Sequence, residues 1–170
     1  MSHTYPLHHS SEVDVPVEPA ALFAKLDDHT RLARHMEKPS LMTAGASMRI
    51  ATDAQRGQAV GSVIRLTGQV LGLRLALEEV VTERVPPIRK TWETRGEPRL
   101  LVIGGYRMGF TRTPREGGSH LVVFIDYRLP EHGMAHGLGK LFGKAYAAWC
   151  TRRMTVDASR GAAMPRGAAP

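Results

Sequence analysis

The sequence is poor in cysteine and in aromatic residues: Cys150 is its only cysteine, and aromatic side chains make up 6% of its 170 residues. A single cysteine excludes an intrachain disulfide. Cys150 ends an Ala-Ala-Trp-Cys run that predicts a helix, and no motif supplies the nearby base that a catalytic thiolate needs. We therefore expect Cys150 to be a buried, inert thiol.

Long apolar runs are also missing. No stretch approaches the roughly 18 apolar residues of a membrane-spanning helix. The polar segment from Met1 to Glu12 lacks the apolar core of a secretory signal. These two absences predict a cytoplasmic protein with no transmembrane segment.

Lysine is scarce as well, because it supplies only five of the 23 basic residues. The 16 acidic residues leave a net charge of +7, but the basic residues are dispersed from Lys25 to Arg166. A dedicated nucleic-acid-binding protein concentrates its basic residues in a recognisable motif that also holds aromatic residues. We therefore expect no specific nucleic-acid partner.

The remaining composition is that of one globular domain. Hydrophobic residues make up 42% of the chain and charged residues 23%, which excludes a disordered chain. A domain of this size buries roughly 70% of the surface that its unfolded chain exposes. We expect this domain over residues 10–157, between an N-terminal tail over 1–9 and a flexible C-terminal tail over 158–170, where periodicity is absent.

Hydrophobic periodicity predicts the order of elements. A strand over residues 10–17 comes first, and Glu18-Pro19 then begins a short helix. A second short helix follows through Arg34. Six strands are predicted over residues 47–53, 58–70, 73–85, 88–95, 100–113 and 120–129, and a long helix over residues 134–157.

These elements predict an α+β fold with one curved sheet. Strands joined by short turns pair as antiparallel neighbours, and a sheet of about seven strands twists and curls. We expect it to wrap around the long C-terminal helix, with a pocket between sheet and helix. Gly137, Gly139 and Gly143 then provide either close approach of the helix to the sheet or room beside the pocket.

A family resemblance rests on Val13–Pro19 with Leu22-Phe23, Asp28-His29 with Leu32, Glu79-Val80, Gly104–Phe110 and Ala145–Cys150. With these motifs, the chain resembles the START/Bet v 1-like superfamily, also called SRPBCC, and within it the polyketide cyclase/dehydrase and lipid-transport branch. The resemblance covers residues 10–157 and implies the helix-grip fold. That superfamily includes carriers, cyclases, regulators and oxygenase ligand domains and has no universal catalytic set, so no catalytic residue is carried over.

Three residues are candidates for proton transfer: His35, Tyr106 and Asp126. His35 is predicted at the pocket mouth, where an unperturbed pKa of about 6.5 suits an acid or a base; the alternative is a helix end with satisfied surface groups. Asp126 lies in mid-strand among Val, Phe and Ile. Glu79 and Glu83 share a strand face by alternation, but about 13 Å separates them, which is too far for one reaction centre.

No metal site and no cofactor are predicted. His29 and His35 are six residues apart, and six residues turn a helix so that the two rings point in different directions. Metal ligands must converge on one point.

Aromatic and methionine side chains are candidates for lining the pocket, with ordinary core as the alternative. If the aromatic strand faces point inward, Lys90, Asp126 and Arg128 lie near the interior or are paired at its rim, because isolated buried charges are costly. The candidate ligand-binding residues are Met36, Met42, Trp92, Tyr106, Met108, Phe110, Phe124, Phe142 and Trp149.

Three functions remain open at this point. The leading hypothesis is binding of a small hydrophobic, lipid- or polyketide-like molecule between the sheet and the C-terminal helix. The second is a cyclase, dehydratase or isomerase that acts on a polyketide-like substrate in that cavity. The third is an interaction module whose basic surface docks a partner and whose interior holds no ligand.

Overall fold

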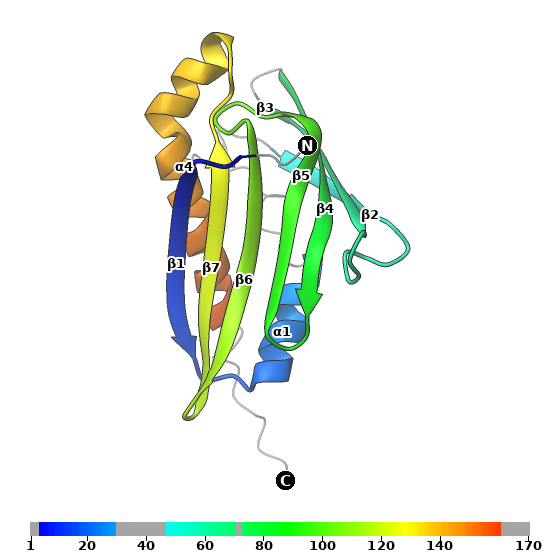
Figure 1. Cartoon of the computed structure of the whole chain (residues 1–170), viewed down its shortest axis with the longest axis vertical. Coiled ribbons are helices and arrows are strands. Elements are labelled where there is room, and N and C mark those ends of the chain that lie inside the picture. The colour runs from blue at the N-terminus through cyan, green and yellow to red at the C-terminus, as the bar shows by residue number, and fades with distance from the viewer. Residues whose placement is uncertain (1–3, 30–46, 71–72, 161–170) are drawn as a thin grey trace.

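Seven strands form one antiparallel sheet in the order β1-β7-β6-β5-β4-β3-β2 (Figure 1). The computed structural model describes residues 4–29, 47–70 and 73–160. Strand β1 pairs with the last strand, β7, and each of the other strands pairs with its neighbour in sequence. The elements are β1 (Leu7–Val15), α1 (Pro19–Asp27), β2 (Ser47–Thr52), β3 (Val63–Val70), β4 (Leu73–Val85), β5 (Arg89–Arg99), β6 (Gly105–Arg115), β7 (Gly118–Arg128) and α4 (Gly133–Arg160).

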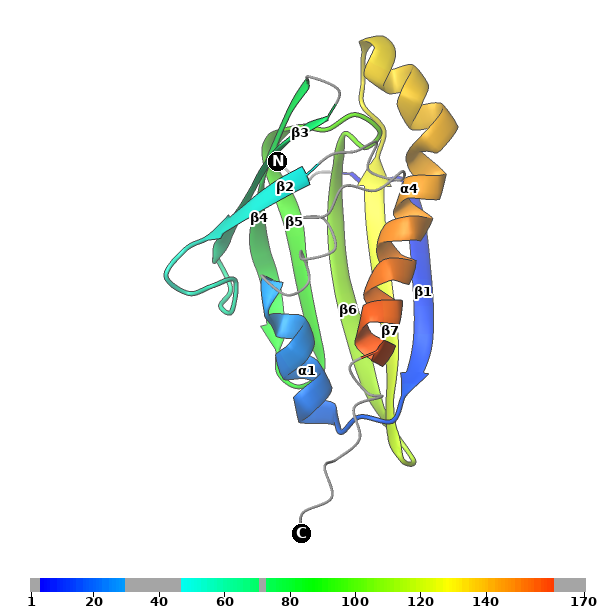
Figure 2. The ribbon, with the colours of Figure 1, turned by 180° about the vertical axis from the view of Figure 1, so that it is seen from behind.

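This arrangement confirms the predicted α+β fold of the helix-grip kind, with its curved sheet, long C-terminal helix and short helix after the first strand. Both α1 and α4 lie on one face of the sheet (Figure 2), which we call the inner face. The second predicted short helix, through Arg34, falls outside the described residues. The strand limits differ from prediction by a few residues: β1 begins at Leu7, and β6 begins at Gly105.

Strict alternation separates the two faces of β7. Leu121, Val123, Ile125 and Tyr127 are buried, while the residues between them are partly exposed. Residues paired across an antiparallel ladder point to the same side of the sheet. The register therefore extends the inner face from Val123 through Phe110 to Lys90, and from Ile125 through Met108 to Trp92.

Helix α4 packs against β1 and β7 through a seam of small residues: Gly139, Gly143, Ala147 and Thr151, all buried. A Cβ at Gly143 would lie 3.0 Å from Leu129 Cδ2 and 3.1 Å from the Val102 carbonyl oxygen, so a larger residue would push the helix outward. The predicted close approach is confirmed at Gly143, beside Tyr127 of β7, and at Gly139, beside Pro130 and the Val102 carbonyl oxygen just outside the strands. A Cβ at Gly137 would meet nothing within 4 Å, so the expectation is wrong there. The Thr151 hydroxyl fixes the lower part of the seam, because its Oγ1 lies 2.8 Å from Ser11 Oγ and 3.0 Å from His9 Nδ1.

Helix α1 is held to the sheet by a buried ion pair at its last residue. The Asp27 carboxylate accepts hydrogen bonds from Lys90 Nζ at 2.7 Å and from Arg84 Nη2 at 2.8 Å. Lys90 has no exposed surface, and its Nζ also donates to the Asp27 carbonyl oxygen at 2.8 Å. Burial opposes ionisation of Asp27, but the hydrogen bonds from Arg84 and Lys90 outweigh it and lower the pKa of this carboxyl.

We expect Asp27→Asn to lower the free energy of unfolding by about 3–5 kcal/mol, because it leaves the Lys90 charge buried without a counter-ion. Urea unfolding at neutral pH measures the change. The matched control is Glu78→Gln, which removes a carboxylate from an exposed ion pair with Arg65 and should cost less than about 1 kcal/mol.

A double variant, Asp27→Leu with Lys90→Met, separates the lost charge balance from lost packing. It should recover most of the stability that Asp27→Asn loses, since both buried charges are then removed together. If Asp27→Asn loses no more stability than the Glu78→Gln control, the ion pair does not hold α1.

Candidate functional site

The inner faces of β4, β5 and β6 form the candidate site. Helix α4 packs mainly on β1 and β7, and α1 packs on β6 and β7. The backbones of these helices therefore do not cover the middle of the sheet, where long side chains fill the space. The wall formed there is largely apolar, with Leu77, Val81, Trp92, Met108 and Phe110 buried on it. Two groups of polar side chains interrupt it.

The first polar group is a carboxyl–phenol pair. The Tyr106 hydroxyl on β6 donates a hydrogen bond to Glu79 Oε1 on β4, and Trp92 on β5 also hydrogen-bonds the same carboxyl group. Glu79 is only 4% exposed. Burial raises its pKa to about 7, although the hydrogen bonds from Tyr106 and Trp92 and the positive charge of Lys90 oppose that rise. At neutral pH this carboxyl group therefore exists in both protonation states.

Helix α4 adds two more polar side chains beside this pair. The Tyr146 hydroxyl hydrogen-bonds the Cys150 sulfur, and both groups act electrostatically on Tyr106. Burial raises the pKa of Cys150 to about 12, so the thiol stays protonated at neutral pH. The raised pKa agrees with the inert thiol expected from the sequence, although the Cys150 side chain is only partly buried. Glu79 is then the group of this cluster that titrates near neutrality.

The second polar group surrounds Lys90 at the end of α1. Lys90 Nζ lies 3.1 Å from His29 Nδ1, and burial together with the Lys90 charge lowers the pKa of His29 to about 3, so the imidazole is neutral. The His29 ring stands edge-to-face against Trp92, with ring centroids 4.8 Å apart. Its Nε2 is buried and has no hydrogen-bond partner among the described residues. Trp92 thus separates the two polar groups and contacts both.

Several sequence-predicted residues meet on this wall. Trp92 and Met108 are directly paired across β5 and β6, Phe110 is paired with Lys90, and Tyr106 lies two residues from Met108 on the same face. Trp149 on α4 is linked to this wall through Tyr146, because the centroids of the two rings lie 5.8 Å apart. These positions place Trp92, Tyr106, Met108 and Phe110 together.

Other predicted residues lie elsewhere. Asp126 is on the opposite face of the sheet, where it pairs with Arg107 Nη2 at 2.7 Å and His8 Nδ1 at 2.6 Å. Phe124 shares that outer face, and Phe142 on α4 is 49% exposed. His35, Met36 and Met42 lie outside the described residues.

Glu79 is the residue that the sequence analysis passed over. By alternation alone, Glu79 and Glu83 share one strand face. A bulge between Val81 and Glu83 shifts the register, so Glu79 points inward while Glu83 pairs with Arg89 at the surface. The available signal was the alternation Leu75, Leu77, Glu79, which places a single carboxylate on an apolar face.

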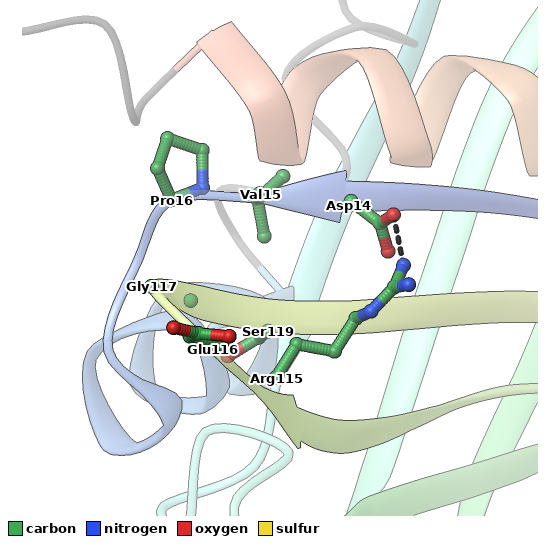
Figure 3. A pocket seen from close by; sticks show the side chains of 8 residues that line it. Asp14, Val15, Pro16, Arg115, Glu116, Gly117 and Ser119 are labelled. Carbon is green, nitrogen blue, oxygen red and sulfur yellow. Dashed lines mark hydrogen bonds and ion pairs between the residues drawn. The ribbon is translucent and has the colours of Figure 1, made fainter.

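A surface pocket of about 400 Å³ lies at the far end of the sheet, lined by Asp14, Pro16 and the β6–β7 turn (Figure 3). Arg115 reaches across it to form an ion pair with Asp14 (Figure 3). His120 Nδ1 also contacts Asp14, at 2.6 Å. Because these charges already neutralise one another, this pocket is a weaker candidate than the inner face.

The described residues bear on two kinds of function, metal binding and membrane spanning. They contain no group of three or more His, Cys, Asp or Glu side chains placed to hold a metal ion. No helix among them is long and apolar enough to cross a membrane.

Comparison with solved structures identifies the fold. The Zhui aromatase/cyclase from Streptomyces sp. R1128 is 14% identical, with 92% of this chain and 93% of that chain covered and a TM-score of 0.67. The di-domain ARO/CYC BexL from the BE-7585A biosynthetic pathway is 12% identical over 94% of this chain and 50% of its own, with a TM-score of 0.60. Ara h 8.0201 is 13% identical over 88% and 97% of the two chains, with a TM-score of 0.52.

No family model matches the chain, and no curated protein matches it. At identities this low, the structural likeness defines a class by fold alone: a helix-grip α+β protein. The chain spans about half the length of BexL.

Replacing Glu79 with Gln should change how stability depends on pH. The folded-state pKa of Glu79 is about 7, whereas the carboxyl of an unfolded chain titrates near 4.5. Between pH 4.5 and about 7, the Glu79 carboxyl group is protonated in the folded wild type and ionised in the unfolded chain. The free energy of unfolding of the wild type therefore falls relative to that of Glu79→Gln as the pH rises through this range. The fall should reach at most about 3 kcal/mol.

Urea unfolding of both proteins between pH 4 and pH 8 measures this difference, and the contribution of His29 cancels because both proteins retain it. Tyr127→Phe is the control, since it removes a phenol from the same face and keeps the carboxyl group. Parallel curves for wild type and Glu79→Gln would show that Glu79 titrates as it does in the unfolded chain.

Proposed function

We propose that this protein binds a small hydrophobic molecule, lipid- or polyketide-like, between the inner face of the sheet and α4. The observation that carries the proposal is the Glu79–Tyr106 pair on a largely apolar wall. Apolar burial supplies the driving force for such a ligand. A small number of buried polar groups then fixes its orientation.

The chemistry of the pair indicates which polar group the ligand carries. With a pKa of about 7, Glu79 both donates and accepts hydrogen bonds at neutral pH, and Tyr106 offers a phenolic hydroxyl beside it. A hydroxyl group satisfies either state of Glu79 because it both donates and accepts, and a carbonyl oxygen accepts from the protonated acid or from the Tyr106 hydroxyl. A fully charged group would have to give up its hydration. The ligand is therefore a largely apolar molecule with a hydroxyl or ketone group at one end.

Two matched probes test this proposal, 2-naphthol and naphthalene, which share a ring system and differ in one hydroxyl. The wild type should bind 2-naphthol more tightly, and Glu79→Gln and Tyr106→Phe should each weaken 2-naphthol binding by roughly tenfold, the value of one hydrogen bond. Their binding of naphthalene should not change. Quenching of tryptophan fluorescence or calorimetry gives the dissociation constants.

Asp126→Asn is the control for this experiment, because Asp126 lies on the outer face and should affect neither probe. Absence of binding for both probes, together with native mass spectrometry that shows no co-purifying small molecule, would overturn the proposal. If Tyr106→Phe loses the same affinity for 2-naphthol and for naphthalene, the Glu79–Tyr106 pair does not recognise the hydroxyl group. The protein would then still be a binder of apolar molecules.

A second candidate function is proton transfer on a polyketide-like substrate, as in a cyclase, dehydratase or isomerase. The observation that favours it is again Glu79, since a carboxyl group with a pKa near the working pH is well suited to general acid–base catalysis. In this candidate Glu79 removes a proton next to a ketone, and Tyr106 stabilises the developing enolate oxygen by a hydrogen bond. Neither His35 nor Asp126 is required for this step.

Deuterium exchange tests the catalytic candidate with 2-tetralone, a bicyclic ketone with acidic protons beside its carbonyl group. In D₂O the wild type should accelerate loss of the NMR signals of those protons, with a rate that rises through about pH 7 as Glu79 ionises. Glu79→Gln should exchange no faster than buffer. If the wild type matches buffer while it still binds 2-tetralone, the protein is a carrier or sensor and the catalytic candidate is wrong.

A further inference from the structure

The first half of α4 exposes large apolar side chains that no packing within the described residues explains. Met134 is 74% exposed, Leu141 71% and Phe142 49%. Seven and eight residues separate Met134 from the other two, which is two helical turns, so the three side chains lie along one side of the helix. This side is turned away from Gly139 and Gly143, which lie against Leu129 and the Val102 carbonyl oxygen. We call Met134, Leu141 and Phe142 the α4 stripe.

Positive charge accompanies the α4 stripe. Lys140 and Lys144 are exposed, one turn apart, and neither forms an ion pair within the described part of the chain. No aspartate or glutamate occurs between residues 132 and 156. The exposed side of the helix is therefore both apolar and basic, a combination typical of helices that lie at the surface of anionic membranes.

A second element contributes at the same end of the molecule. Leu73, which begins β4, is 47% exposed, and Arg74 beside it is also exposed. Figures 1 and 2 both place the start of β4 and the start of α4 at one end, opposite the β6–β7 turn. Two segments far apart in sequence thus expose the same combination of apolar and basic side chains at one end of the molecule.

The charges decide between the possible occupants of this end. A second copy of the chain would bring Lys140 and Lys144 of both copies together, with no carboxylate on either stretch of helix to neutralise them. The α4 stripe also stands on the outer side of a helix, so it offers no groove for a partner helix. Lipid phosphates neutralise the lysines, and the headgroup region accepts the apolar side chains without a shaped counterpart.

We propose that this end of the molecule docks onto the surface of an anionic lipid bilayer. Met134, Leu141 and Phe142 enter the boundary between headgroups and acyl chains, and Lys140 and Lys144 lie over the lipid phosphates. The docking is peripheral, and it does not depend on any ligand of the inner face.

Sedimentation with vesicles tests the proposal, using phosphatidylcholine alone and phosphatidylcholine with 30% phosphatidylserine. The wild type should partition onto the anionic vesicles at least tenfold more strongly than onto the neutral ones, and added salt should weaken the binding. The double variant Lys140→Gln/Lys144→Gln should lose roughly tenfold or more. Leu141→Ser/Phe142→Ser should lose a similar factor, because apolar insertion contributes separately from charge.

Matched controls lie at the opposite end of the molecule. Arg89→Gln/Arg115→Gln removes the same number of positive charges from exposed ion pairs there, and Val85→Ser/Ile88→Ser removes two exposed apolar side chains from the β4–β5 turn. Both controls should bind like the wild type. Far-ultraviolet circular dichroism of each variant checks that α4 remains folded.

Three results would overturn the proposal. If Arg89→Gln/Arg115→Gln loses as much vesicle binding as Lys140→Gln/Lys144→Gln, the vesicles attract the protein through its total positive charge and no particular face docks. Failure of the wild type to sediment with anionic vesicles would exclude the lipid surface. Self-association on gel filtration that Leu141→Ser/Phe142→Ser abolishes, without vesicle binding by the wild type, would assign the α4 stripe to a contact between copies.

Discussion

The close contact between α4 and the β1–β7 side of the sheet sets the position of the other groups on the inner face. Gly139, Gly143 and Ala147 let the helix backbone approach the sheet, and Thr151 ties it to His9 and Ser11. Once the helix is fixed on that side, Tyr146 and Cys150 turn toward the middle of the sheet. The glycines lower helix propensity by roughly 0.5–1 kcal/mol each, and the short distance that they permit is what compensates for this cost.

Two buried carboxyl groups on the inner side behave differently because their neighbours differ. Asp27 faces two cations at hydrogen-bond distance, so its charge is neutralised and it serves to attach α1. Glu79 receives hydrogen bonds only from neutral groups, and Lys90 acts on it from farther away. Burial therefore favours the neutral acid at Glu79, and the same kind of side chain provides a structural link in one place and a titrating group in the other.

Much of the fold follows from local periodicity, whereas the site depends on register. Alternation located the strands, and the order of elements was sufficient for the helix-grip fold. Alternation also placed Trp92, Tyr106, Met108 and Phe110 on faces that the pairing brings together. It could not locate the bulge beside Val81, which separates Glu79 from Glu83, because a bulge depends on two strands and not on one. The face of Asp126 was undetermined for a similar reason, since only the pairing of β7 with β1 and β6 shows that it points outward.

Helix α4 shows why apolar periodicity misleads where a helix packs through glycine. Leu138, Leu141, Phe142 and Trp149 recur at helical spacing, which normally marks the side of a helix that faces the core. Here the buried side consists of Gly139, Gly143, Ala147 and Thr151, so close backbone contact has replaced large side chains as the means of attachment. Leu141 and Phe142 are then released from a packing role, and Leu141 projects into solvent. A large exposed apolar surface is unfavourable in water unless something covers it. The two lysines beside it, with no carboxylate over 25 residues of sequence, indicate that the cover carries negative charge, and this distinguishes a lipid surface from a second copy of the same basic chain.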